Sequence, residues 1–224
     1  MKELLGNRIK AAIFDIDGTL LDSMPMWQDV CARYLLSIGI TPEPDLSKKV
    51  FSMTLKEGCK YTKEQYKLDI SEDEIEDGII KLIEHFYYYE VELKPGAKEL
   101  IMELNAKNIP MVLATTGDED LATHALLRNG IFNYFKKLYT CGEYNTSKRE
   151  RYIFDLAKTE LETILGSRLD YENIAVFEDS LTAIRTTKDA GFFVVGLKDD
   201  ACLEEQEEIK KLADCYYESL TNIQ

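Results

Sequence analysis

The chain has 224 residues, 45% of them hydrophobic and 30% charged, and its formal net charge is −14 at pH 7. That length suits one large domain or two smaller ones, and the acidic balance argues against a nucleic-acid-binding or anionic-membrane-binding surface, which would be basic. No apolar segment approaches the roughly 20 residues that a membrane-spanning helix needs.

The first predicted element is a short buried strand that ends in acidic residues. Residues 11–15 read Ala-Ala-Ile-Phe-Asp, and Asp17 and Gly18 follow closely. Because side chains alternate along a strand, Asp15 and Asp17 share one face, at the carboxyl end where open α/β sheets bind ligands. Two such carboxylates suit a hard cation such as Mg²⁺, and one can act as nucleophile while the other acts as general acid and base.

The next part of the chain predicts helices only. A capping box, Ser71-Glu72-Asp73-Glu74, begins the last of them. We therefore expect a helical cap domain, residues 23–94, inserted into a core formed by residues 1–22 and 95–224. Its expected helices are Pro25–Ser37, Asp45–Phe51, Leu55–Tyr66 and Ser71–Tyr89.

From residue 95 onward, short apolar segments alternate with helical patterns. This alternation predicts a doubly wound, Rossmann-like parallel sheet with helices on both faces. The further expected strands are Pro110–Ala114, Lys137–Thr140, Ile174–Phe177 and Phe193–Leu197, and the expected helices are Gly96–Lys107, Glu119–Asn129, Arg149–Leu165 and Ser180–Ala190.

Four clusters along the chain resemble the motifs of the haloacid dehalogenase-like phosphohydrolases. The first is the segment Asp15-x-Asp17-Gly18-Thr19-Leu20-x-Asp22-Ser23. Thr115 matches the second motif, Lys148 the third, and Glu178-Asp179-Ser180 the fourth, in the family's order. Taken singly, a threonine can start a turn and an acidic pair can favour a helix N-terminus. The four together, each at a strand end or a helix start, predict one site.

The resemblance implies a role for each matching residue. Asp15 would be the nucleophile that forms an aspartyl-phosphate, and Asp17 the general acid and base. Lys148 and Thr115 would stabilise the phosphoryl oxygens. The substrate phosphate would also contact the turn at Thr116 and Gly117, and the Mg²⁺ ligands would be Asp15, Asp17, Glu178 and Asp179.

Two departures from the family pattern concern the later motifs. Arg149 stands where a proline usually follows the lysine of the third motif, and Ala183 stands where the fourth motif usually has a glycine.

Asp17 distinguishes among the reactions of this family, because a leaving alkoxide needs a proton. It favours a phosphatase that hydrolyses a small phosphomonoester, such as a sugar phosphate. A β-phosphoglucomutase-like mutase is the alternative, although Leu55 stands where a mutase's cap-loop arginine is expected. A phospho-accepting signalling or binding protein is a further alternative, against which the helical insertion and the Asp15 and Asp17 pair speak.

The cysteines and the first residues predict the compartment. Five cysteines form no C-x-x-C pattern, and residues 1–10 contain no apolar core of a secretory signal. We therefore expect free thiols in a cytoplasmic enzyme, with a phosphorylated metabolite as its partner.

Overall fold

The computed structural model describes residues 8–51 and 53–223, and the chain divides into two compact units. One, here called the sheet unit, consists of Met1–Asp22 and Glu92–Gln224; the other, the helical insertion, is Ser23–Val91. Residues 92–94 group with the sheet unit, whereas the sequence placed them in the insertion.

The sheet unit is built on six parallel strands in the order β3-β2-β1-β4-β5-β6. This is the doubly wound architecture that the alternating pattern predicted. The strands are β1 (Ala11–Phe14), β2 (Met111–Thr115), β3 (Phe135–Thr140), β4 (Ile174–Glu178), β5 (Phe193–Leu197) and β6 (Cys215–Tyr217).

The central strands are covered on both faces. Every residue of β1, β2 and β4 is buried, which explains their continuous apolar sequences. On one face, Phe14 and Phe177 stack with ring centroids 4.2 Å apart. The opposite face of β1 presents Ala11 and Ile13 to a separate apolar cluster.

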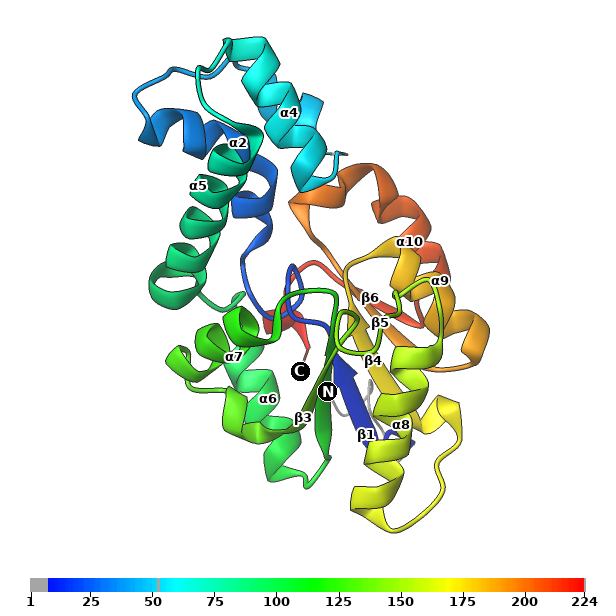
Figure 1. Cartoon of the computed structure of the whole chain (residues 1–224). Coiled ribbons are helices and arrows are strands. Elements are labelled where there is room, and N and C mark those ends of the chain that lie inside the picture. Colours follow the sequence, from blue (N-terminus) through cyan, green and yellow to red (C-terminus); the bar gives the residue numbers. More distant parts are fainter. Residues whose placement is uncertain (1–7, 52, 224) are drawn as a thin grey trace. The chain divides into compact units, whose positions relative to one another are not determined.

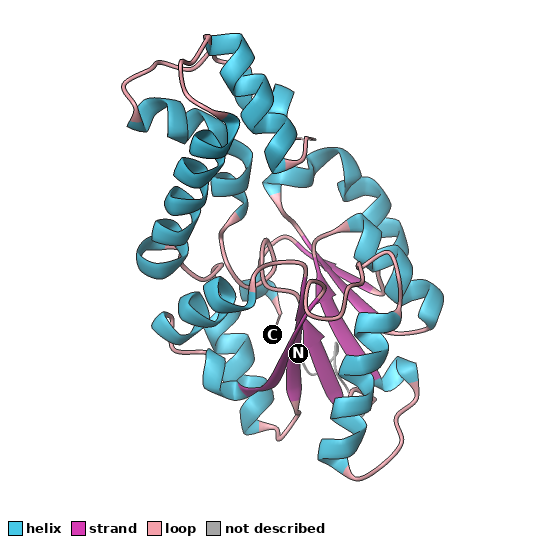
Figure 2. Cartoon of the chain, in the orientation of Figure 1, coloured by secondary structure: helices cyan, strands magenta, loops and turns pink. Residues whose placement is uncertain are grey.

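Helices lie along both faces of this sheet (Figures 1 and 2). The apolar cluster with Ala11 and Ile13 includes residues of α8 (Tyr152–Leu165), α9 (Leu181–Ala190) and α10 (Gln206–Leu212). The other side carries α6 (Ala97–Ala106) and α7 (Glu119–Arg128). The remaining short helices are η2 (Phe132–Tyr134), η3 (Tyr171–Asn173), η4 (Asp200–Glu205) and η5 (Leu220–Asn222).

Several boundaries in the sheet unit, and one strand, differ from the expected ones. Strand β3 begins two residues early, at Phe135, so it also includes Lys136, and both Lys136 and Lys137 are exposed. Helix α8 begins at Tyr152 instead of Arg149, which leaves Lys148 in an irregular turn. Strand β6 was not expected, because its three residues are only half-buried and form no apolar run.

The helical insertion contains α2 (Met24–Ser37), α3 (Leu46–Val50), α4 (Leu55–Tyr66), α5 (Glu72–His85) and the π-helix η1 (Phe86–Glu90). Capping boxes start both α4 and α5. The sequence predicted the one that starts α5. The expected last helix is thus α-helical only to His85 and continues as η1. Within the described residues, no helix is long and apolar enough to cross a membrane.

Candidate active site

Most of the predicted site residues follow neighbouring strands at one edge of the sheet. Asp15 comes directly after β1, Thr115 ends β2, and Glu178 ends β4 with Asp179 next. The backbone N–H of Asp15 donates to the Phe177 carbonyl at 3.0 Å, which continues the β1–β4 ladder up to the site. The strand order changes direction at β1, and ligands bind at such a switch point in α/β sheets.

Lys148 reaches this edge from the turn between β3 and α8. Its Nζ donates hydrogen bonds to Asp15 Oδ1 and to Glu178 Oε1. All three side chains are buried. Burial alone would lower the pKa of Lys148, but the two carboxylates outweigh it and hold that pKa above its ordinary value. The lysine therefore remains charged and links the first, third and fourth motif matches.

The acidic residues at the end of β4 have raised pKa values, so their surroundings disfavour their charged forms. Burial, opposed by Lys148 and assisted by the Asp15 charge, raises the pKa of Glu178 to about 7. Burial and the charges of Asp15, Glu178 and Asp199 raise the pKa of Asp179 well above its ordinary value. One lysine does not neutralise so many buried carboxylates, so further positive charge would stabilise them.

The carboxylate oxygens fit a divalent cation. One oxygen each from Asp15, Glu178 and Asp179 lies within 4.8 Å of the others, and all three residues are buried. An oxygen-only donor set with excess negative charge is what Mg²⁺ prefers. Glu178 is already engaged, because its Oε2 also accepts the backbone N–H groups of Asp179 at 3.1 Å and Ser180 at 3.0 Å.

The second part of the site is the turn after β2. The backbone N–H of Gly117 donates to Thr115 Oγ1 at 3.0 Å, and the Thr115 side chain is fully buried. A methyl group at Gly117 would lie 3.0 Å from Asp17 Oδ2 and 3.3 Å from Thr115 Oγ1. Gly117 therefore leaves room for the half-buried Asp17 beside Thr115. Thr116 lies in the same turn with an exposed side chain.

Thr19 belongs to the site although the sequence reasoning gave it no role. Its side chain is fully buried, and its Oγ1 donates to Asp179 Oδ1 at 3.0 Å. Only its place inside the first motif match could have indicated it. Thr19 thereby ties the segment after β1 to the acidic residue after β4.

A family model and several sequence relatives match this chain. The family model described as "haloacid dehalogenase-like hydrolase" matches residues 9–191. A "Phosphorylated carbohydrates phosphatase" of Thermotoga maritima is 24% identical over 183 residues, which cover 82% of each chain. The 6-phosphogluconate phosphatase of Escherichia coli is 25% identical over 195 residues, covering 84% of this chain and 82% of the relative.

A solved structure extends the likeness to the fold of the chain. The crystal structure titled "putative beta-phosphoglucomutase" from Thermotoga maritima superposes with a TM-score of 0.81, covering 96% of this chain and 98% of that one, at 23% sequence identity. At that identity the likeness establishes a shared fold.

Proposed function

Because the chain belongs to the haloacid dehalogenase-like hydrolases, we propose that it is a Mg²⁺-dependent phosphatase that hydrolyses a small phosphomonoester. The buried hydrogen bonds from Lys148 to Asp15 and Glu178 carry this proposal. They hold a charged lysine against Asp15, the carboxylate that would attack phosphorus, and Asp17 would be the proton donor. This combination suits phosphoryl transfer through an enzyme-bound intermediate.

In the first step, a carboxylate oxygen of Asp15 attacks phosphorus and the bond to the ester oxygen breaks. Asp17 gives its proton to that leaving oxygen, so an alcohol departs and an aspartyl-phosphate forms. In the second step, Asp17 takes a proton from water, whose oxygen attacks phosphorus and releases inorganic phosphate and the Asp15 carboxylate.

Lys148 and Thr115 stabilise the charge on the transferring group in this scheme. Lys148 supplies a fixed positive charge in a buried setting, where charge stabilisation is strong. The Thr115 Oγ1 already accepts the Gly117 N–H, which leaves its own proton to donate to a phosphoryl oxygen. The exposed Thr116 would offer its backbone N–H to the same phosphate, and Gly117, whose own N–H is donated to Thr115, would leave room for that phosphate in the turn.

The metal would be held by carboxylates of this site, with Asp15 and Asp179 as the main protein ligands and Glu178 as a further one. Asp17, the fourth ligand that the resemblance implies, would bind the metal only through an oxygen other than the one that carries the transferred proton. When bound, Mg²⁺ neutralises the excess negative charge and polarises the phosphoryl group. Asp179 is the better ligand than Glu178, because Lys148 and two backbone N–H groups already occupy both Glu178 oxygens.

The substrate class is a small phosphorylated metabolite, with a sugar phosphate as the first candidate. The phosphatases from Thermotoga maritima and Escherichia coli are named for phosphorylated carbohydrates and for 6-phosphogluconate. The proposal includes the helical insertion as a cap domain and a cytoplasmic location, which the free thiols of Cys31, Cys59, Cys141 and Cys215 would suit.

Phosphate release from a panel of small phosphomonoesters tests this function. Wild type, Asp15→Asn and Asp170→Asn are compared with Mg²⁺ and with a chelator. Asp170 is an exposed acid before β4, at the opposite end of that strand from the site, so its variant controls for loss of one surface charge.

We expect Mg²⁺-dependent release by wild type and Asp170→Asn, and a loss of about 10³-fold or more in Asp15→Asn. Folded wild-type protein that releases no phosphate from any ester would contradict the proposal. Bisphosphate-primed isomerisation of β-glucose 1-phosphate without net release would instead establish the mutase reaction.

A further inference from the structure

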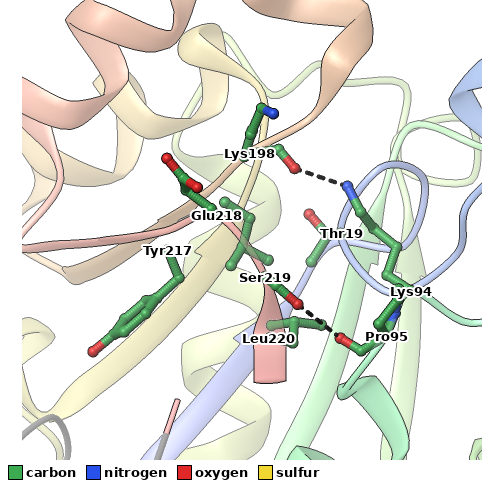
Figure 3. A pocket seen from close by; sticks show the side chains of 9 residues that line it. Thr19, Lys94, Pro95, Lys198, Tyr217, Glu218, Ser219 and Leu220 are labelled. Atoms are coloured by element: carbon green, nitrogen blue, oxygen red, sulfur yellow. Dashed lines mark hydrogen bonds between the residues drawn. The ribbon is translucent and has the colours of Figure 1, made fainter. Parts of the chain in front are cut away.

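Lys94 forms a buried junction next to the candidate site, in the segment where the chain re-enters the sheet unit. Its Nζ donates to the Gly18 carbonyl at 2.6 Å, to the Lys198 carbonyl at 2.9 Å and to Asp199 Oδ2 at 2.8 Å. Figure 3 shows Lys94 reaching the Lys198 carbonyl across a pocket of about 180 Å³ that Thr19 also lines.

These three bonds use the whole donor capacity of the ammonium group. A lysine has three N–H donors and no acceptor, and each donor here has a protein acceptor at hydrogen-bond distance. The Lys94 side chain is 17% exposed and the Asp199 side chain 6%. Lys94 is therefore built to hold protein groups together, and it offers no donor to a ligand in the pocket.

One of the groups that Lys94 holds is the turn after β1. Gly18 lies between Asp17 and Thr19, with a positive φ of 81° that glycine adopts without strain. Thr19 in turn donates to Asp179 Oδ1 at 3.0 Å. Lys94 thus holds the Gly18 carbonyl, which lies between Asp17, the proposed acid and base, and Thr19, whose hydroxyl is bonded to Asp179.

The same ammonium also neutralises a buried acid close to Asp179. Asp199 follows β5, and its Oδ1 accepts the Ala201 N–H at 2.8 Å, while its Oδ2 faces Lys94. The Asp199 charge is among those that act on Asp179. The ion pair therefore compensates one negative charge next to the proposed metal ligands and fixes the loop that carries it.

The backbone around Lys94 is also held. The Lys94 N–H donates to the Leu20 carbonyl at 2.8 Å, and the Asp22 N–H donates to the Glu92 carbonyl at 2.9 Å. Residues 20–22 and 92–94 are thus hydrogen-bonded to each other within the sheet unit. The backbone around Lys94 is therefore fixed against residues 20–22, which directly follow the turn that the Lys94 side chain holds.

We propose that Lys94 is a positioning residue for phosphoryl transfer, which fixes the turn from Asp17 to Thr19 and thereby the orientation of Asp179 toward the metal. The inference rests on the proposed function, in which Asp17 moves protons and Asp179 binds Mg²⁺. Partners that orient metal ligands typically change metal affinity or activity by about 10–100-fold when they are removed.

The test compares Lys94→Met with Lys188→Met. Lys188 Nζ contacts Asp214 Oδ2 at 2.7 Å, and that oxygen also accepts the Val194 N–H. This lysine–aspartate pair lies at the amino-terminal ends of β5 and β6, so it matches the chemistry of Lys94 and Asp199 away from the site. Mg²⁺ affinity is measured by calorimetric titration without substrate, and kcat and KM with the best ester.

For Lys94→Met we expect Mg²⁺ affinity and kcat each to fall about tenfold or more, with KM for the ester changed less than about threefold. For Lys188→Met, Mg²⁺ affinity and kcat should stay within about twofold of wild type. If the two variants behave alike in metal affinity and in kcat, Lys94 has only a structural role and the inference is overturned.

Lys94→Arg is the second test variant, to be used if Lys94→Met does not fold. Arginine preserves the charge opposite Asp199, but its planar guanidinium cannot present three donors from one atom. We expect at least about threefold weaker Mg²⁺ binding in this variant, and wild-type binding and kcat would overturn the inference. Because the titration needs no substrate, a weaker Mg²⁺ affinity in Lys94→Met supports Lys94's role even if wild type hydrolyses no ester.

Discussion

The sheet unit and the helical insertion bury different kinds of side chain. Within the described residues, the buried charged side chains all lie in the sheet unit: Asp15, Lys148, Glu178, Asp179 and Asp199. The buried polar residues of the insertion are Ser23 and Thr62, and its interior is otherwise apolar. The buried charges of the sheet unit thus belong to the candidate site and to the Asp199 ion pair beside it, while the insertion is stabilised by apolar packing and helix caps.

Replacing Lys148 should have the largest effect on the buried charged residues of the sheet unit. Lys148→Met leaves Asp15 and Glu178 buried without their cation, and removing one partner of a buried ion pair costs about 3–5 kcal/mol. Urea unfolding with a chelator measures the loss, and phosphate release should fall at least about 100-fold. Mg²⁺ should restore part of the stability, because it supplies positive charge at the same carboxylates.

Lys158→Met is the matched control for Lys148→Met. Lys158 contacts Glu162 at 2.5 Å on α8, where the two side chains are 12% and 16% exposed and Glu162 also accepts the Leu169 N–H, so we expect a smaller loss of about 1–2 kcal/mol. Equal unfolding free energies for both variants would mean that the buried cluster is not specially dependent on its lysine.

A cavity in the insertion should reduce stability without changing the chemistry of the sheet unit. Ile79 is fully buried on α5, so Ile79→Ala should cost about 2–5 kcal/mol. Unfolding by urea, followed by circular dichroism, measures this cost. Its neighbour Ile80 is 38% exposed, and Ile80→Ala should change the unfolding free energy by about 0.5 kcal/mol or less.

Mg²⁺ binding by Ile79→Ala and Ile80→Ala, measured under native conditions, tests whether the metal site depends on the core of the insertion. Both should bind Mg²⁺ like wild type, because the proposed ligands belong to the sheet unit. A weakened Mg²⁺ affinity in Ile79→Ala, absent in Ile80→Ala, would show that the insertion's core supports the metal site.

Gly117→Ala should affect activity more than stability. Its new methyl group would lie 3.0 Å from Asp17 Oδ2 and must displace that carboxylate slightly. A small misplacement of a reacting group can cost up to about 100-fold in rate, and we expect a loss of about tenfold in kcat. Gly142→Ala is the control, since nothing lies within 4 Å of its added methyl group. Equal kcat values for the two variants would contradict the placement of Asp17 beside Gly117.

A further expected effect is a pH dependence of stability without metal. The folded-state pKa of Glu178 is raised from 4.5 to about 7, so the folded protein binds this proton more tightly than the unfolded chain. Its contribution is complete below the unfolded pKa and is lost as the pH rises through about 7. The melting temperature with chelator should therefore fall between about pH 5 and 8, and less steeply in Glu178→Gln. Parallel profiles for the two proteins would refute this assignment.

Local sequence patterns predicted the strands that carry the site. The segments that became β1, β2 and β4 are short, apolar and followed by polar residues, and parallel strands bring such ends to one edge of a sheet. That is why Asp15, Thr115 and Glu178 could be placed at one edge before any contact was known. The role of each residue in catalysis stays a prediction until the variants are measured.

Other features had no local signal. Strand β6 is three half-buried residues, and it forms because β5 offers it a pairing edge. The engagement of both Glu178 oxygens depends on the turn after β4 and on a lysine 30 residues earlier. Nothing in the composition around Lys94 predicts that its ammonium meets Gly18 and Asp199, which are 76 and 105 residues away.

The sequence by itself thus determined the doubly wound sheet, the helical insertion and the residue types at the strand ends, because periodicity and strand polarity are local properties. Only the tertiary structure decided which oxygen faces Lys148, how Thr19 ties to Asp179, and where Lys94 finds its three acceptors. Those choices depend on hydrogen-bond geometry between distant segments, and burial makes that geometry specific because each buried polar group needs a partner.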